Sequence, residues 1–512
     1  MKAPRTAINS AWIVDKFWTP LGVLTIVAVY AAVHFGLRFA LSPTLGLDDA
    51  AQAVLAQDLR WGYHFRQPPL YTWVTWAAFQ VFGVGLFALT LVKYLFLFAG
   101  YAFLYAAAHN ILKEDRLAAL ALFSYGLIYV FAYYAHHDLT DSIAAGTMIA
   151  AALHAITRIV ERGGWPDYAY LGITFGLGLL SKYHFAIFLA AVALAAFLVP
   201  DMRRRVLNRK IWLTVAVNAA VVTPYVLWVY EGAYSFVALT AAVTHAGGSG
   251  AYGEALARGF LKLASALVEF PMPFLLIALL ILPALVWPLK VWTSNPQGYR
   301  RFLGIVMLAA VVIFILGVIL LGATKFKGRW MYPALMVLPI FLFAGIAIER
   351  LSVRRVRAYL GVILAVSVLV FAVRVVADHV HPTVCKACRA FLPYAALAEQ
   401  IRAGGFARGV ILADTDHLAG NLLMLFPASR VISANKSLDA PPPGVDDQCL
   451  MVWRGDSESI PATLRVFAGR ALSLNEPPFV RTGWVNAGLV NAEHRRIAFS
   501  FALIEGAAGR CS

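Results

Sequence analysis

The sequence predicts a polytopic membrane protein of the all-α class that carries a small α/β domain at its C-terminal end. Of its 512 residues, 61% are apolar and only 14% are charged, whereas about a quarter of the residues of a soluble globular protein are charged. In addition, apolar runs of roughly 20 residues recur between Leu21 and Val376, and a helix of that length crosses a bilayer. The composition therefore excludes a soluble enzyme.

We predict about eleven membrane-spanning helices, each about 20 residues long. Their ranges are 19–41, 86–109, 117–134, 142–160, 168–181, 184–199, 211–230, 265–287, 302–321, 332–348 and 358–377. The apolar segment 70–82 is shorter and follows two prolines, so we expect an interfacial helix there, with a short true span as the alternative. No small-residue cleavage site follows the first span, which is therefore expected to stay in the protein.

Lysine and arginine are concentrated in alternate connections between these spans. Because positive charge is retained on the cytoplasmic side, these connections indicate the inner side and place the amino terminus there. The residues are Lys2, Arg5, Lys16, Lys113, Arg116, Arg158, Arg162, Arg203, Arg204, Arg205, Arg209, Lys210, Lys290, Arg300, Arg301, Arg350, Arg354, Arg355 and Arg357. With its net charge of +16 placed in this way, the chain is expected to bind membrane lipids and no nucleic acid.

The sequence divides into a membrane domain, 1–377, and an outer α/β domain, 378–512. Within the second domain, residue patterns predict helices and strands in alternation. The helices are predicted at 393–402 and 417–426, and the strands at 409–413, 430–433, 450–453 and 495–504. This alternation is typical of a small two-layer or three-layer α/β unit.

All four cysteines lie in this outer domain. An even number confined to the outer side predicts two disulfides in an oxidising compartment, although the sequence does not give their pairing. A zinc or redox site at the first pair is the alternative, which the lack of a second ligand pair disfavours. The cysteines are Cys385, Cys388, Cys449 and Cys511.

Acidic residues mark the outer ends of two spans. Asp48 and Asp49 follow the first span, and Asp138 and Asp141 follow the third. Carboxylates at a membrane boundary are costly unless they bind a cation, a sugar hydroxyl or a proton, and two such sites can converge in a helical bundle. A solvated loop is the alternative for either pair. The neighbouring candidates for metal ligands are His136, His137 and Asp138, although adjacent residues splay apart on a helix.

Basic residues also occur on the outer side, despite the bias against them there. Lys182 interrupts an apolar stretch, and three more alternate with aromatic residues: Lys325, Lys327 and Arg329. Such a cluster suits an anionic phosphate, and extension of the side chains toward lipid headgroups is the alternative. Lys93 is a further candidate, whereas Glu269 could be either structural or functional.

Acids beside a phosphate site indicate transfer chemistry. The sequence contains no glycine-rich phosphate loop, and an outer compartment has no nucleotide sugars, so the group donor would be membrane-borne. A polyprenyl phosphate is the simplest such donor. A carboxylate would deprotonate the acceptor hydroxyl while lysine and arginine stabilise the departing phosphate.

These motifs resemble the GT-C superfamily of membrane glycosyltransferases, in the branch of protein O-mannosyltransferases, lipid A aminoarabinose transferases and lipopolysaccharide galacturonic-acid transferases. Five segments occur in that family's order: Asp48-Asp49, Gln67 to Trp73, Asp138 to Asp141, Gly176 to Lys182, and Lys325 to Pro333. Two positions depart from the pattern. Asp49 stands where the family has glutamate, and Gln67 stands where it has a basic residue.

The resemblance implies a GT-C fold and an inverting hexosyl or pentosyl transferase that uses a polyprenyl-phosphate-linked sugar. The acceptor would be a cell-envelope glycolipid, such as lipid A or the lipopolysaccharide core, or a protein, at the periplasmic face of the bacterial inner membrane. Asp48 is the implied catalytic base. The implied substrate-binding residues are Asp49, Asp138, Asp141, Lys182, Lys325, Lys327 and Arg329. The resemblance leaves open whether a divalent cation is needed.

Two other functions are compatible with a polytopic chain of this kind. A secondary transporter would usually show internal repeats with interrupted helices in matching positions, and we find no such repeat. A lipid-linked glycan polymerase or ligase would transfer a whole glycan, and the sequence does not distinguish it from a transferase of one sugar.

Overall fold

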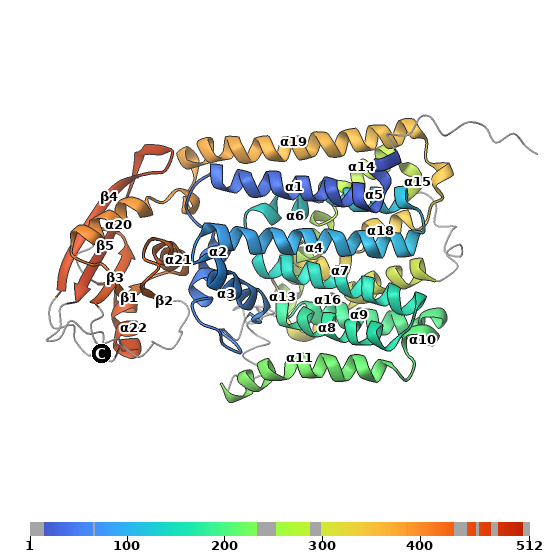
Figure 1. The fold of residues 1–512 in the computed structure, drawn as a ribbon, viewed down its shortest axis with the longest axis horizontal. Coiled ribbons are helices and arrows are strands. Elements are labelled where there is room, and N and C mark those ends of the chain that lie inside the picture. Colours follow the sequence, from blue (N-terminus) through green and yellow to red (C-terminus); the bar gives the residue numbers. More distant parts are fainter. Residues whose placement is uncertain are drawn as a thin grey trace, which may run out of the picture.

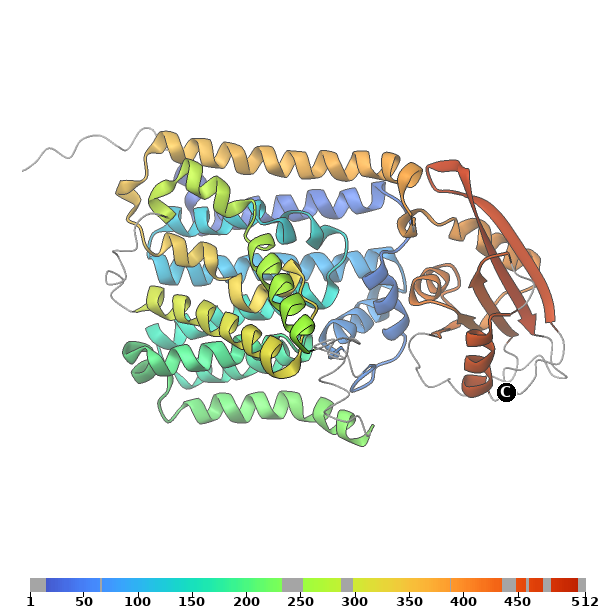
Figure 2. The same ribbon diagram turned by 180° about the vertical axis from the view of Figure 1, so that it is seen from behind.

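Long apolar helices, packed side by side, form most of the protein (Figures 1 and 2). The computed structural model describes residues 15–64, 67–232, 252–286, 298–386, 388–434, 448–456, 460–472 and 480–504. Within these ranges, 6 helices are long and apolar enough to cross a membrane. They are α1 (Pro20–Ala40), α4 (Leu86–Leu112), α7 (Thr140–Glu161), α11 (Ile211–Glu231), α16 (Tyr299–Leu321) and α19 (Val353–Val384).

Three further predicted spans differ in their regularity. Helix α8 (Trp165–Ser181) is continuous and packs against α7 and α11. Helices α9 (Phe185–Leu198) and α10 (Pro200–Val206) form a pair bent by 108°, which would count as one more span. The segment predicted as 117–134 is broken into α5 (Asp115–Phe123), a 3-10 turn η2 (Ser124–Leu127) and α6 (Tyr129–Ala132).

The predictions of single helices over 265–287 and 332–348 are wrong. The first range contains the end of α13 (Tyr252–Glu269), then α14 (Phe274–Ile281) and α15 (Pro283–Val286), and the second contains α17 (Tyr332–Leu335) and α18 (Leu338–Phe343). Pro271, Pro273 and Pro283 fall at the breaks of the first range, and Pro339 falls in the first turn of α18. Proline has no amide hydrogen to donate, so it often breaks a helix interior but is tolerated in a first helical turn. The described residues therefore contain fewer unbroken spans than the eleven predicted.

Two short helices, α2 (Leu47–Leu55) and α3 (Leu70–Phe82), lie between the bundle and the sheet (Figure 1). Helix α3 has the bounds predicted for the interfacial helix, follows Pro69 and ends at Gly83, whose φ of 76° favours glycine. With 13 residues, it is too short to cross a bilayer. Helix α2 packs on one side against α3 and on the other against the C-terminal domain.

The C-terminal domain is built on a five-stranded sheet in the order β2-β1-β3-β5-β4. Strands β1 (Gly409–Ala413), β2 (Arg430–Ser433) and β3 (Gln448–Arg454) are parallel, whereas β4 (Val480–Leu489) and β5 (Ala492–Ile504) form an antiparallel hairpin on the β3 edge. Its helices are α20 (Tyr394–Ala403), α21 (Asp416–Leu425) and α22 (Ala462–Leu472). The predicted α/β class, both predicted helices and the four predicted strands are confirmed, whereas β4 and α22 were not predicted.

One predicted disulfide is present, between Cys385 and Cys388. Because these sulfurs are bonded to each other, they are not zinc ligands. Cys449 is also disulfide-bonded, and Cys511 lies outside the described residues. The Cys385–Cys388 turn follows α19 directly, and Arg495 of β5 holds it by donating to the Cys385 carbonyl oxygen at 2.9 Å. The disulfide therefore stands at the junction between α19 and the sheet.

We expect thiol titration of the denatured, unreduced protein to find no free thiol, since four cysteines would then form two disulfides. The reduced protein is the positive control and should give four thiols. Two thiols in the unreduced sample would contradict the second disulfide, and four would contradict both together with the oxidising compartment.

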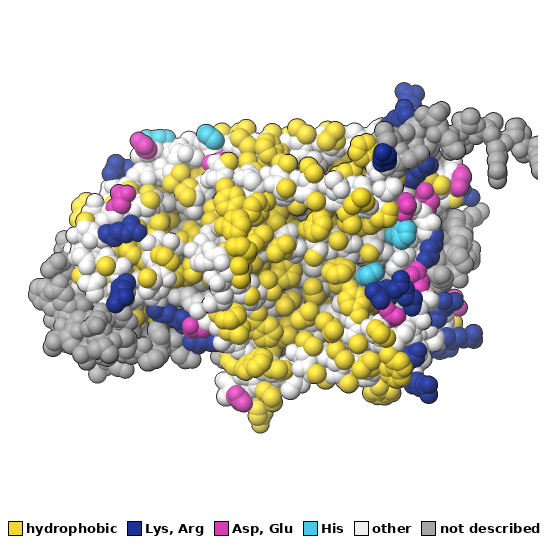
Figure 3. All heavy atoms as spheres, viewed as in Figure 1, with side chains coloured by type: hydrophobic (Ala, Val, Ile, Leu, Met, Phe, Trp, Pro, Cys, Tyr) yellow, Lys and Arg dark blue, Asp and Glu magenta, His cyan; other side chains and the backbone are white. Residues whose placement is uncertain are grey.

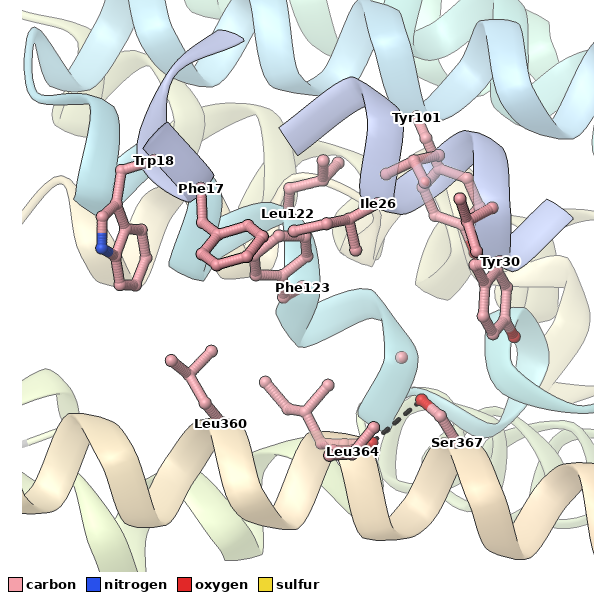
Figure 4. Close-up of a pocket in the computed structure, with 14 residues that line it drawn as sticks. Phe17, Trp18, Ile26, Tyr30, Tyr101, Leu122, Phe123, Leu360, Leu364 and Ser367 are labelled. Carbon is pink, nitrogen blue, oxygen red and sulfur yellow. Dashed lines mark hydrogen bonds between the residues drawn. The ribbon is translucent and has the colours of Figure 1, made fainter. Parts of the chain in front are cut away.

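A cavity of about 400 Å³ lies between α1 and α19 (Figure 4). Its walls are aromatic and aliphatic side chains, among them Phe17, Ile26 and Leu364. The two lining hydroxyls already have hydrogen-bond partners: the Tyr30 hydroxyl bonds to His136, and the Ser367 hydroxyl donates to the Ile363 carbonyl oxygen. Among the described residues, no charged side chain lines this cavity, and the acids and bases that the sequence predicts for the site lie elsewhere.

Candidate active site

The first predicted acid, Asp48, lies in the first turn of α2 and joins two loops. Its Oδ2 accepts a hydrogen bond from the Leu139 amide at 2.9 Å, and the Asp48 amide donates to Oδ1 of Asp138 at 3.4 Å. A carboxylate in a first helical turn is also favoured by the helix dipole. Among the described residues, Oδ1 of Asp48 has no hydrogen-bond partner. One carboxylate oxygen therefore stays available to accept a proton.

The loop that holds Asp48 has an unusual backbone. Leu139 has a φ of 75°, in the left-handed region that a branched side chain rarely adopts. In this conformation its amide faces Asp48. Gly46, at the start of α2, lies so close to the same loop that a Cβ atom there would be 2.9 Å from Oδ1 of Asp138. Backbone of this kind often occurs at functional sites, and it brings Asp48 and Asp138 together.

The second acid, Asp49, is directed away from Asp48 and forms a buried ion pair. Its Oδ2 accepts from Nζ of Lys93 at 2.9 Å, and the two side chains are only 7% and 5% exposed. Nζ of Lys93 also donates to the His137 carbonyl oxygen at 3.3 Å. Oδ1 of Asp49 is buried and unpaired within the described ranges. This ion pair links α2 to α4, and the substrate contact predicted for Asp49 stays a prediction.

Asp141 is held by two amide side chains. Gln52 donates to its Oδ1 at 3.0 Å and Gln67 donates to its Oδ2 at 2.8 Å. Thr72 donates in turn to Gln52 at 2.7 Å. Gln67 is the residue that stands where the family has a basic one, and here its neutral amide orients the acid. Asp141 is therefore held within the site by α2 and by the segment that leads into α3.

Lys182 and Arg329 come together at one small cavity. Nζ of Lys182 donates to Oγ of Ser142 at 2.6 Å, and the same small cavity is lined by Ser142, Lys182, Arg329 and Trp330. Ser142 follows Asp141 directly, so the basic side chains lie beside the acidic loop. Two cations at one cavity wall suit a phosphate.

The segment that carries Arg329 is anchored by Glu269. Oε2 of Glu269 accepts from the Gly328 amide at 3.2 Å, so Glu269 has a structural contact. The guanidinium of Arg329 lies 5.7 Å from the Tyr134 ring centre, and Nζ of Lys327 lies 5.7 Å from that of Trp330, both within the range of cation–π contacts. Lys325 is exposed and does not line the cavity.

The charges of this site act on one another. Burial lowers the pKa of Lys182; the carboxylates of Asp141 and Asp48 raise it, and the charges of Arg329 and Lys327 lower it. Burial also raises the pKa of Asp138, and the nearby charge of Asp48 adds to this increase. The structure therefore brings six of the predicted residues into one electrostatic unit: Asp48, Asp138, Asp141, Lys182, Lys327 and Arg329.

The three candidate metal ligands, His136, His137 and Asp138, do not come together as a ligand set among the described residues. Both ring nitrogens of His136 are engaged, with the hydroxyls of Tyr30 at 2.8 Å and Tyr94 at 3.0 Å, and its ring stacks on His34 at 4.0 Å. In the part of the chain that the structure describes, no group of three His, Cys, Asp or Glu residues is arranged to hold a metal ion.

Sequence reasoning missed Gln52, Thr72 and Leu139. Gln52 lies one helical turn after Asp48, so helical spacing could have placed it near the acids. The contact of Thr72 and the backbone of Leu139 leave no signal in the sequence, because they depend on how α2, α3 and α7 meet.

Comparison with known proteins agrees with this geometry. Residues 66–228 match a family described as dolichyl-phosphate-mannose-protein mannosyltransferase. Two lipopolysaccharide core galacturonosyltransferases of Rhizobium johnstonii are similar over most of their length. RgtA is 30% identical over 84% of this chain and 86% of its own, and RgtB is 29% identical over 89% and 92%.

The fold is similar to that of ArnT from Cupriavidus metallidurans, whose crystal structure was solved bound to undecaprenyl phosphate. The TM-score is 0.61 at 14% identity, over 94% of this chain and 98% of that one. The expected resemblance is therefore confirmed, and the relatives favour a glycosyltransferase over a transporter. The chain is a membrane glycosyltransferase of the GT-C superfamily and belongs to the family of the lipopolysaccharide core galacturonosyltransferases.

Proposed function

We propose that the protein transfers galacturonic acid from a polyprenyl phosphate to a sugar of the lipopolysaccharide core, at the outer face of the bacterial inner membrane. The observation that carries this proposal is that the carboxylate of Asp48 acts electrostatically on Lys182, which lines one cavity with Arg329. The sugar and the acceptor follow from the names of the relatives, and the shared fold with ArnT supports a lipid-phosphate donor.

In the proposed reaction, Asp48 acts as the general base. Its Oδ1 takes the proton of the acceptor hydroxyl, whose oxygen attacks the anomeric carbon of the donor sugar. The bond from that carbon to the phosphate oxygen breaks, and the polyprenyl phosphate leaves with its negative charge stabilised by Lys182 and Arg329. Attack opposite the leaving group inverts the anomeric carbon. Asp141 would orient the acceptor, and Lys327 would add to the positive field.

The proposed orientation follows from the distribution of charge over the surface. On the face shown in Figure 3, lysine and arginine gather at the end of the bundle remote from the sheet, beyond a broad apolar band. The exposed arginines of α10, Arg203, Arg204 and Arg205, belong to this end. Since positive charge favours the cytoplasm, residues 378–512 would lie in the periplasm, with 1–377 as the membrane-embedded catalytic domain.

The test of this function is the structure of the core oligosaccharide. We expect mass spectrometry of lipopolysaccharide from a strain that lacks the gene to show the loss of a uronic acid residue. A wild-type copy of the gene should restore that residue. Purified protein given a polyprenyl-phosphate galacturonic acid donor should add that residue to the deficient lipopolysaccharide. An unchanged core in the deletion strain would contradict the proposal.

We expect Arg329→Gln to weaken donor binding by about tenfold or more, because a charge-assisted hydrogen bond to phosphate contributes about 1.5–3 kcal/mol. The measurement is the affinity for undecaprenyl phosphate in detergent. Arg258→Gln is the matched control, since Arg258 is an exposed arginine on the neighbouring helix α13. Equal affinities for the two variants would remove Arg329 from the phosphate site.

A further inference from the structure

A second polar cavity, of about 230 Å³, lies where the C-terminal domain meets the start of α2. We call it the β1–β3 pocket, since it lies at the carboxyl ends of those two strands, which finish at Ala413 and Arg454. Strand β1 leads to β2 on one side, and β3 pairs with β1 on the other. In open parallel sheets, a crevice forms at the carboxyl ends of two neighbouring strands whose chain connections run to opposite sides, and ligands bind in that crevice.

The pocket carries two arginines. Arg389 and Arg454 both line it, both are exposed, and neither forms an ion pair within the described ranges. Their charges act on His417, another lining residue: burial lowers its pKa to about 4, and the charges of Arg389 and Arg454 add to this shift against the opposing hydrogen bond to Leu45. Two guanidinium groups at one cavity suit a carboxylate or a phosphate.

The same pocket holds a carboxylate that lacks one partner. Oδ2 of Asp414 accepts from the Arg454 amide at 3.1 Å, whereas its Oδ1 is buried and has no hydrogen-bond partner among the described residues. A buried acceptor of this kind is costly unless a ligand or water satisfies it. A hydroxyl group would do so, since it donates to a carboxylate oxygen. The aromatic rings of Tyr394 and Phe499 form an apolar part of the pocket wall.

The pocket fits a sugar that carries an acidic group. Its arginines would bind the acidic group, Asp414 would accept from a hydroxyl, and the aromatic side chains would contact the sugar ring. A simple anion would make no use of Asp414, and a neutral sugar would make no use of the arginines. The volume is far above the ~30 Å³ of one water and slightly below the ~300 Å³ of small ligand pockets. The β1–β3 pocket can therefore hold a single sugar unit and not a long glycan.

The pocket adjoins the start of helix α2, which carries the proposed base. Leu47, the residue before Asp48, forms part of its wall. His417 lies behind that wall: its Nε2 donates to the Leu45 carbonyl oxygen at 2.8 Å, and its Nδ1 accepts from the Tyr394 hydroxyl at 2.8 Å. Asn421 accepts from the Leu45 amide at 2.8 Å. A ligand in the pocket would lie beside the start of α2.

The contact between the two domains leaves little freedom here. Helix α21 packs on α2 at Gly420, where a Cβ atom would lie 2.3 Å from the Ala50 carbonyl oxygen. The pocket and the acidic site therefore keep a fixed relation, as the two ends of one acceptor would require.

We propose that the β1–β3 pocket binds an acidic sugar unit of the acceptor, through Arg389 and Arg454, and so presents the neighbouring hydroxyl to Asp48. This inference rests on the proposed function, because it takes the acceptor to be a charged core glycan. The acidic group is a sugar carboxylate or a phosphate ester, two sources that share the same chemistry.

The experiment measures binding of deacylated core oligosaccharide to the full-length protein in detergent, by titration calorimetry. We expect Arg389→Gln and Arg454→Gln each to lower the affinity about tenfold or more. Arg408→Gln should leave it unchanged. It is the matched control, since Arg408 is an exposed arginine before β1, at the opposite end of the sheet. Equal affinity of the wild type and both pocket variants would overturn the proposal.

Chemical forms of the oligosaccharide distinguish the two sources. If its carboxyl groups are reduced to alcohols, or its phosphates are removed, one of the two changes should abolish the difference between the wild type and the pocket variants. If neither change does, no acidic group is recognised in the pocket and the proposal is wrong.

Transfer kinetics separate this proposal from the proposed function. In the pocket variants, KM for the acceptor should rise while kcat and KM for the donor stay at wild-type values, which a merely structural role would not produce. A wild type that binds the oligosaccharide through the arginines but transfers no galacturonic acid would overturn the function and support the pocket. Normal transfer of galacturonic acid with an unaltered KM for the acceptor in both pocket variants would support the proposed function and overturn the pocket proposal.

Discussion

Asp48→Asn is expected to lower the rate of sugar transfer by about 10²–10⁴-fold, the usual contribution of a general base, and to leave donor binding intact. The substitution removes the charge that takes up the proton but keeps an oxygen that can accept from the Leu139 amide, as Oδ2 of Asp48 does at 2.9 Å. The measurements are initial rates of transfer and the affinity for undecaprenyl phosphate on the same preparation.

The comparison that makes this result specific is with Asp58→Asn. Asp58 is a partly exposed acid beyond the other end of α2, paired with Arg60 and Arg430, and its replacement should affect transfer far less. Both variants must elute as a single species in detergent. A well-folded Asp48→Asn protein that transfers sugar at the wild-type rate would remove the proposed base and leave the mechanism without a proton acceptor.

Hydropathy alone predicts the regular helices, because a lipid-facing helix must be apolar over its whole length. Helices α1, α4, α7 and α16 begin and end within three residues of the predicted ranges. The break after Glu269 was not predicted, since the segment keeps its apolar character while its prolines interrupt the hydrogen bonds. A helix boundary set by proline is visible in sequence only when proline is weighed against hydropathy.

In the outer domain, the strands that alternate with helices were predictable and the hairpin only in part. Strands β1 and β2 have the predicted bounds because each is a short apolar run beside a turn. Strand β4 contains Gly483 and Gly488, which are unfavourable in strands, and it exists because it pairs with β5 along its whole length. Tertiary pairing overrides local preference there.

The candidate site shows the same limit at the level of side chains. Residue type and order suffice to select Asp48, Asp141, Lys182 and Arg329. They do not distinguish Asp48 from Asp49, which are neighbours in sequence but point into different surroundings: one oxygen of Asp48 is available, whereas Asp49 is buried against Lys93. Burial and partner choice arise only when α2 meets α4.

We expect Lys93→Met to destabilise the protein by about 3–5 kcal/mol, the usual effect of removing one member of a buried ion pair. The substitution leaves the Asp49 carboxylate without its cation, at a position where its Oδ1 already has no partner among the described residues. Lys113→Met is the matched control at the other end of α4, because the pair that Lys113 forms with Glu161 is 54% exposed at the lysine. Surface pairs contribute about 0–1 kcal/mol.

The double variant Asp49→Asn/Lys93→Met shows whether the loss comes from the ion pair itself. Neutralising both residues removes the uncompensated charge, so the double variant should be more stable than Lys93→Met alone, and the coupling energy should exceed the ~0.5 kcal/mol expected of independent sites. The measurement is the unfolding midpoint in detergent for the wild type, both single variants and the double variant. If Lys93→Met destabilises no more than Lys113→Met, the pair is not structural. The acid at position 49 would then return to the substrate-binding role that the family resemblance implies for it.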